Sequence, residues 1–235
     1  MKFLSEANYD WIEILNFFER PFRAKLIPSK VWKDLDRYRN DGVGLANYVK
    51  KWKTKVEWFP QRSKAKFFDT RVAVGGEYDP ETRQCIIQIH TTQYDTFTFT
   101  DKTWELFKFK VIQVLMHEMV HFMQYDRRGD EWDHHVLRHK KVGNLRKDTE
   151  RSYLSSPDEV QAYAHCVLLD FKVFKPNISV SDLLSRANAY NDSRTLRYIL
   201  KTFDYDYSNN YAIPKLINEV LKWERKYYKI SGAHK

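Results

Sequence analysis

The sequence His-Glu-x-x-His at residues 117–121 holds the side chains best suited to chemistry. Its histidines, His117 and His121, are four residues apart, so in a helix both imidazoles lie on one face and can bind the same metal ion. Glu118 follows the first histidine and can lean over the open coordination position of that metal. There it can take the proton of a metal-bound water and later pass it to a leaving amine. The spacing therefore predicts a catalytic zinc site with Glu118 as its acid/base.

A zinc ion of this kind needs a third protein ligand, and Glu159 is the first candidate. It follows a Ser-Pro-Asp sequence that is typical of a helix start, with serine as the N-cap and proline in the first turn. On that helix Tyr163 lies about 40° from Glu159, whereas His165 lies about 120° away. We therefore expect His165 not to share a metal with Glu159.

A group of histidines downstream of the motif is the second candidate. It follows the motif after a short loop, and one of its members would also complete a catalytic zinc site. Its members are His134, His135 and His139. Arg138, Lys140 and Lys141 lie beside them, so this stretch resembles a solvated basic segment. The sequence therefore favours Glu159 over the histidine group.

Hydrophobic periodicity places these residues among helices that precede and follow a small sheet. Short β-branched runs at residues 71–76 and 84–90 flank a turn sequence at 79–82 and predict a β-hairpin. The period of the remaining chain is helical. The predicted helices cover residues 6–19, 29–40, 44–58, 103–125, 156–174, 179–190, 193–203 and 213–229. Helices, then a small sheet, then helices indicate an α+β fold.

The motif and the downstream segment Ser-Pro-Asp-Glu-Val-Gln-Ala-Tyr-Ala together resemble the zincin metallopeptidases of the glutamate-ligand type, the gluzincins. More narrowly, residues 85–170 are similar to small metallopeptidases encoded by bacteriophages, in which P-x-E-x-x-A-Y-A follows the HExxH helix. The resemblance implies a zincin-like core, zinc on His117, His121 and Glu159, and Glu118 as the catalytic acid/base.

The resemblance also raises two expectations about the surroundings of the metal. Gluzincins often place an aspartate four residues after the ligand glutamate, where this chain has Tyr163. We predict that Tyr163 stabilises the oxyanion of the reaction, with Tyr153 as an alternative. Zincins also carry an edge strand that binds substrate as an added strand. Residues 85–90 are the candidate for that strand, and an interior position in the sheet is the alternative.

Positive charge is concentrated at the start of the chain. Residues 1–67 contain 15 Lys/Arg and 8 Asp/Glu, whereas residues 68–235 contain 25 and 23. The first region also holds four of the seven tryptophans, one of them within the basic run at residues 50–55. We interpret residues 1–67 as a basic, Trp-rich helical region packed on a metallopeptidase core at 68–235. Its charge suits nucleic acid or an acidic partner, and a solvated helix face is the alternative.

Composition excludes several classes of protein. The 43% hydrophobic content of the 235 residues suits a folded chain rather than a disordered one. No apolar run approaches the roughly 18 residues of a spanning helix, and the first ten residues do not read as a signal peptide. Cys85 and Cys166 are too far apart in sequence for a disulfide framework or a zinc ribbon. We therefore expect a cytoplasmic protein without a membrane partner, in the host cytoplasm or the virion if a phage encodes it.

These observations predict a zinc-dependent peptidase that acts on a protein or peptide substrate. The alternative belongs to another class. It is a basic protein that binds nucleic acid or protein on a zincin scaffold whose metal site is idle or structural.

Overall fold

The computed structural model describes residues 28–39, 41, 44, 47–48, 55–60, 72–91, 101–128, 147–175, 178–186, 189–206 and 211–231. The chain divides into two compact units, Met1–Phe122 and Met123–Lys235. The division falls within one long helix, α4 (Asp101–Arg128). The boundary expected at residue 67 stays a prediction.

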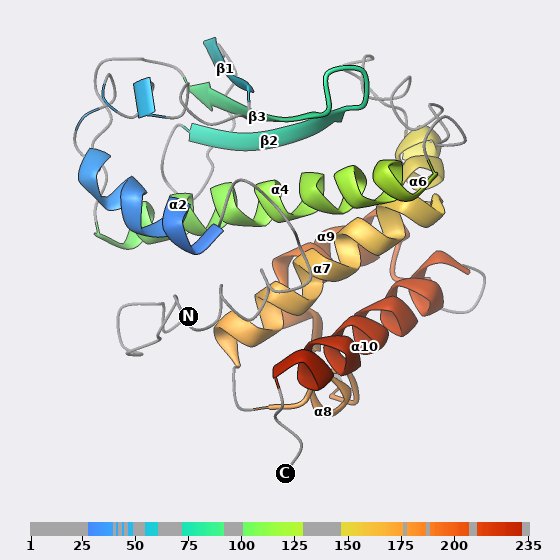
Figure 1. The fold of residues 1–235 in the computed structure, drawn as a ribbon. Coiled ribbons are helices and arrows are strands. Elements are labelled where there is room, and N and C mark those ends of the chain that lie inside the picture. The colour runs from blue at the N-terminus through green and yellow to red at the C-terminus, as the bar shows by residue number, and fades with distance from the viewer. Residues whose placement is uncertain are drawn as a thin grey trace. The chain divides into compact units, whose positions relative to one another are not determined.

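The first unit combines helices with a three-stranded sheet. Its elements before α4 are α2 (Pro28–Leu35), the short 3-10 helix η1 (Asp36–Tyr38), β1 (Lys55–Pro60), β2 (Val72–Asp79) and β3 (Gln84–Thr91). The strand order is β1-β3-β2, with β1 parallel and β2 antiparallel to β3. Figure 1 shows β2 and β3 running along α4. Helices with a small sheet confirm the predicted α+β class.

The predicted hairpin is confirmed, and its turn depends on one side chain. The Asp79 carboxylate accepts hydrogen bonds from the Glu81 N–H at 2.9 Å and the Thr82 hydroxyl at 2.6 Å. Arg83 closes the turn with a φ of 53°. Aspartate bonded to the backbone two residues later is a common turn former, so the sequence signal had a direct physical cause.

One prediction about this sheet is wrong, and one open choice is decided. The helix expected at 44–58 does not continue to its end, because residues 55–60 form β1. Their sequence, KVEWFP, is rich in β-branched and aromatic residues, which suit a strand. For residues 85–90 an edge and an interior position were both open, and β3 is hydrogen-bonded on both sides, so the interior alternative holds. An interior strand has no free edge for an added peptide.

Helix α4 matches the prediction for residues 103–125 and is buried along most of its length. Every residue from 111 to 120 is buried, which suits a helix that is apolar on all sides. Its N-terminal part is tied to η1, because the Trp104 indole N–H and the Lys108 ammonium both donate to Asp36 Oδ1, at 2.9 and 2.6 Å. Lys108 also pairs with Glu105 at 2.8 Å. These contacts account for a lysine that is only 2% exposed.

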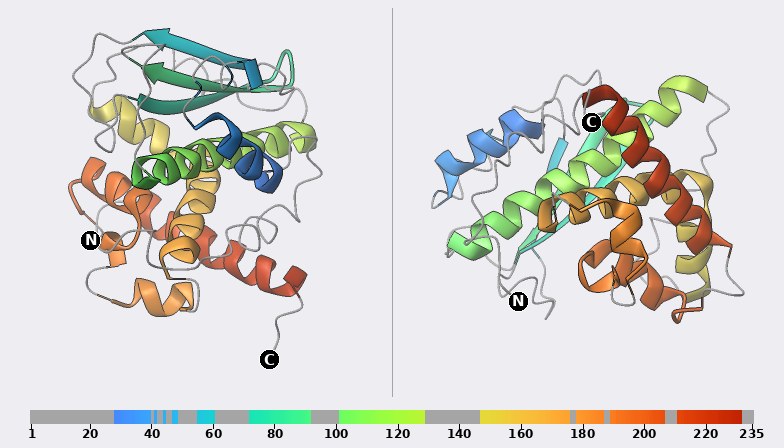
Figure 2. Two further views of the ribbon diagram at one scale, coloured as in Figure 1. Left: turned by 90° about the vertical axis from the view of Figure 1, so that its left-hand side faces the viewer. Right: turned by 90° about the horizontal axis from the view of Figure 1, so that it is seen from below.

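In the second unit, helices pack around a central helix. The helices that follow α4 are α6 (Lys147–Ser155), α7 (Pro157–Phe174), α8 (Val180–Leu184), the 3-10 helix η3 (Ala189–Asn191), α9 (Arg194–Thr202) and α10 (Ala212–Ser231). Helix α7 contacts α6, α8, α9 and α10, and Figure 2 shows α10 crossing beside it. The helix predicted at 179–190 is shorter than expected and ends at Leu184. Helices were correctly predicted near 156–174, 193–203 and 213–229, whereas α6 was not predicted.

Across the residues with an assigned structure, the helices are too short or too polar for any of them to cross a bilayer. The predicted helix at 6–19 and most of the basic run at 50–55 lie outside the described residues.

Candidate metal centre

Glu159 is positioned by the N-terminal cap of α7. Ser156 adopts an extended backbone, and its Oγ accepts a hydrogen bond from the Glu159 N–H at 3.3 Å. Pro157 occupies the first turn, where its missing N–H leaves no helix bond unmade. The predicted helix start is thus confirmed. It places Glu159 in the first turn of a buried helix with its side chain fully buried.

A polar clamp holds this first turn against the C-terminal end of α4. The Gln124 amide donates to the Asp158 carbonyl oxygen at 3.1 Å and to Gln161 Oε1 at 2.9 Å. Arg128 forms an ion pair with the Asp158 carboxylate at 2.6 Å. All four residues belong to the second unit. The clamp therefore fixes the first turn of α7 to the last turns of α4.

The two histidines of the motif lie on one face of α4, as their spacing predicted. His117 is 7% exposed and His121 is 2% exposed. Their Nε2 atoms are 3.2 Å apart, and their rings meet edge to face with an interplanar angle of 79°. The two imidazoles therefore direct the same ring nitrogen toward a shared point from different directions.

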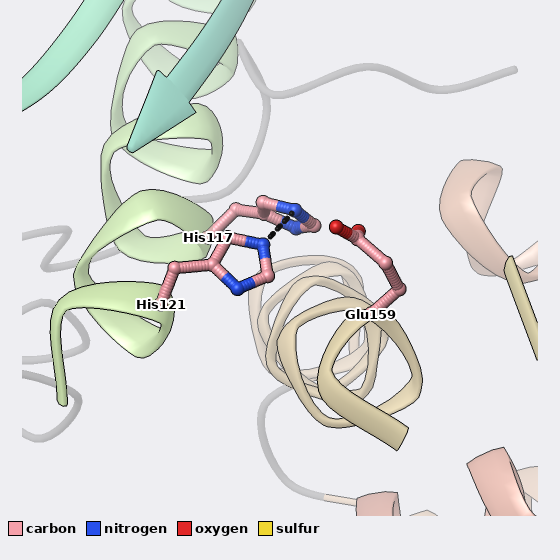
Figure 3. A group of neighbouring side chains, drawn as sticks. All are labelled: His117, His121 and Glu159. Atoms are coloured by element: carbon pink, nitrogen blue, oxygen red, sulfur yellow. Dashed lines mark hydrogen bonds between the residues drawn. The ribbon is translucent and has the colours of Figure 1, made fainter. Parts of the chain in front are cut away.

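The structure brings Glu159 to that point. His117, His121 and Glu159 each offer one ligand atom, and these atoms all lie within 4.8 Å of one another. Figure 3 shows the His117 ring beside the Glu159 carboxylate and the His121 ring next to that of His117. The metal set predicted from the sequence is therefore one buried group.

The geometry of this group suits a tetrahedral metal. Two ligand atoms at about 2.0–2.1 Å from a tetrahedral zinc ion are about 3.3 Å apart. The histidine nitrogens, at 3.2 Å, already have this spacing. Two imidazole nitrogens with one carboxylate oxygen form a donor set that suits zinc, whereas calcium and magnesium prefer oxygen ligands alone.

Glu118 belongs to the same helix but lies against the sheet. Its side chain is 2% exposed. A Cβ added at Gly76 of β2 would lie 2.8 Å from Glu118 Oε1. The Cys85 thiol of β3 is near enough for the Glu118 charge to add to the effect of burial, and both raise the pKa of that thiol. Glu118 is thus a buried carboxylate next to a ligand in sequence. It is not a member of the converging group, as expected.

The structure places the remaining candidates as follows. Tyr163 is half-buried on α7, with its ring centroid 6.4 Å from that of Tyr198, and its catalytic role stays a prediction. Tyr153 is half-buried on α6, and its catalytic role also stays a prediction. His165 packs against Trp223, 3.9 Å between ring centroids, and its expected exclusion from the metal site stays a prediction. The competing histidines, at positions 134, 135 and 139, lie outside the described residues.

Sequence reasoning missed two features of this site. The Gln124–Asp158 clamp has no sequence signal, because it joins residues 34 apart through a backbone carbonyl. The contact of Gly76 with Glu118 did have a signal. Glycine inside a strand often marks a close approach of backbone to another group, and the sequence has Gly75-Gly76 in the middle of β2.

Comparison with protein-family models, curated proteins and solved structures found no match to this chain.

Proposed function

We propose that this chain is a zinc-dependent peptidase with a zincin-like core. One observation carries the proposal: an HExxH helix and a glutamate 38 residues later converge into one buried group of metal-ligand type. The resemblance to gluzincins named the same three ligands. The α+β fold, with a sheet running along the HExxH helix, is compatible with a core of this kind.

Each residue of the group has a definite task in this proposal. His117 and His121 bind through Nε2, so both imidazoles are neutral and carry their proton on Nδ1. Glu159 contributes a carboxylate oxygen. Bound zinc would supply a Lewis acid that polarises the peptide carbonyl and makes a water more acidic. Glu118 accepts a proton from the attacking water on its carboxylate oxygen and passes it to the leaving amine.

Strand β2 is our proposed binding edge for the substrate, in place of the interior strand β3. In the three-stranded sheet described here, β2 has a hydrogen-bonded neighbour on one side only. It also lies next to the base, because its Gly76 approaches the Glu118 side chain. An extended peptide that pairs with an edge strand gains backbone hydrogen bonds regardless of its side chains.

The test is a comparison of two glutamates on α4. Wild type, Glu118→Gln and Glu105→Gln are loaded with zinc and assayed on fluorescently quenched casein. We expect Glu118→Gln to retain zinc and to lose at least about 100-fold in hydrolysis, as is typical for a lost acid/base. Glu105 pairs with Lys108 far from the motif, so its variant should keep nearly full activity. Full activity of Glu118→Gln would contradict the proposal.

A second candidate function follows from the charge of residues 1–67, where the net charge is +7. In this alternative the chain binds nucleic acid or an acidic protein, and its metal is idle or structural. Fluorescence anisotropy with a labelled duplex at two salt concentrations tests it, because neutralised phosphates release counterions and make affinity fall steeply with salt. Absence of binding at low salt would remove this candidate.

A further inference from the structure

Strand β2 approaches α4 at Gly76 so closely that no side chain fits there. A Cβ built at Gly76 would lie 2.8 Å from Glu118 Oε1, 3.0 Å from Glu118 Cγ and closer still to Val114 Cγ1. Carbon atoms in folded proteins pack at about 3.5–4.0 Å. The position therefore excludes every residue except glycine unless the strand, Val114 or Glu118 moves.

Gly76 leaves a gap in a row of side chains on one face of β2. Alternate residues of β2 face the same way, so Val74, Gly76 and Tyr78 share one face of the sheet. Val74 is 7% exposed and Tyr78 is 1% exposed, and the Tyr78 ring rests edge to face on Phe122 of α4. The row is thus buried at both ends, and at Tyr78 it packs on α4. The Glu118 side chain occupies the place between them.

Space, rather than backbone conformation, explains glycine at this position. The φ angle of Gly76 lies outside the left-handed region that favours glycine. The residue pairs in regular antiparallel register with Ile87 of β3. Alanine is therefore compatible with the backbone, and the atoms nearest to its Cβ belong to two α4 side chains, Val114 and Glu118.

We propose that Gly76 is a positioning residue for Glu118: the missing side chain creates the slot in which the carboxylate is held. Its catalytic consequence rests on the function proposed above, whereas the slot itself does not. A general base must be held within about 0.5 Å of its productive position, and a misplacement of about 1 Å can cost about 100-fold in rate. A methyl group in the slot would displace the carboxylate by a distance of that order.

The first test of the slot needs neither bound metal nor an activity assay. A double-mutant cycle combines Gly76→Ala with Glu118→Ala and measures urea unfolding midpoints of the metal-free protein. If the new methyl group meets the carboxylate, Gly76→Ala should lower the midpoint less in the Glu118→Ala background than in wild type. Equal shifts in the two backgrounds would overturn the proposal.

A second variant separates Glu118 from the other neighbour. Val114→Ala removes the nearer clash and should restore folding if Gly76→Ala alone is too unstable to purify. In the Val114→Ala background, Gly76→Ala then conflicts with Glu118 alone. Gly75→Ala is the matched control for the unfolding measurements, because the neighbouring position faces the other side of the sheet.

The catalytic consequence is read from kcat and KM on a quenched casein peptide. We expect Gly76→Ala in the Val114→Ala background to lower kcat by at least about 10-fold relative to Val114→Ala alone, with zinc content and KM unchanged. If the double variant has the kcat of Val114→Ala, Gly76 has only a packing role and the proposal is wrong. If wild type hydrolyses nothing while the stability cycle shows coupling, the peptidase function fails and the slot stands.

Discussion

Helix α7 buries one carboxylate near each of its ends, and the surroundings of the two differ in kind. Asp170, near the C-terminal end, accepts hydrogen bonds from the Ser193 hydroxyl at 2.8 Å and from the Thr195 N–H at 3.0 Å. Both donors lie at the start of α9, where the helix dipole favours a negative charge. Glu159, near the N-terminal end, instead converges with two imidazole nitrogens.

The difference shows that burial alone does not mark a functional carboxylate. Both side chains are fully buried, and taking a charge out of water is costly unless other groups compensate it. At Asp170 the chain supplies N–H and O–H donors, so the carboxylate joins two helices. At Glu159 the neighbouring histidine nitrogens carry lone pairs when they act as ligands, so a cation is the partner that all three groups have in common.

The largest expected effect is on zinc affinity, which should depend on Glu159 at one end of α7 and not on Asp170 at the other. Glu159→Gln removes a charged ligand and should weaken zinc binding by at least about 100-fold, beyond the 10–100-fold typical of residues that only orient ligands. Asp170→Asn should leave zinc affinity unchanged. Competition with a fluorescent zinc chelator measures both. Equal affinities of Glu159→Gln and wild type would remove Glu159 from the ligand set.

The next largest effect is on the free energy of unfolding. Here the loss should be larger at Asp170 than at Glu159. Asp170→Ala leaves the Ser193 hydroxyl and the Thr195 N–H without their acceptor inside the protein, and should lower the free energy of unfolding by about 2–3 kcal/mol. Glu159→Ala should destabilise the metal-free protein less, because the carboxylate it removes is suited to a bound cation. Urea unfolding in the presence of a chelator compares the two variants. A larger loss at Glu159 would reverse the comparison between the ends of α7.

The smallest effect concerns the sheet side of the site. Burial, and then the charge of Glu118, raise the pKa of the Cys85 thiol above its value in the unfolded chain. The folded state therefore holds this proton more tightly, and the resulting stability is complete below about pH 8.5 and falls as pH rises further. Between about pH 8 and pH 9.5 the loss from one such group is about 1 kcal/mol. Urea midpoints across this range should fall less steeply for Cys85→Ala than for wild type, and identical slopes would contradict the assignment.

Local signals were sufficient to predict the two helices that carry the candidate ligands. The i, i+4 histidines and the apolar run before them defined α4, because one helical period accounts for both. The Ser156 cap with Pro157 defined the start of α7 and hence the position of Glu159. The choice of Glu159 as third ligand combined this cap with the family resemblance, and the structure brings the three side chains together.

Non-local pairing was beyond these signals. Residues 55–60 join the sheet by parallel pairing with β3, about 30 positions later in the chain, and no local pattern specifies that partner. The same pairing makes β3 interior, which decides between the two positions that the sequence left open. The contact between Gly76 and Glu118 likewise joins residues that are distant in sequence, and the glycine pair in β2 indicated a close approach without naming what approaches.

The central claim is that His117, His121 and Glu159 bind one zinc ion, and anomalous scattering at the zinc edge tests it most directly. Crystals grown with one equivalent of zinc should show a single strong anomalous peak. We predict His117 Nε2, His121 Nε2 and a Glu159 carboxylate oxygen within about 2.0–2.2 Å of that peak. A strong peak on His134, His135 or His139, with none between the HExxH helix and Glu159, would contradict the account.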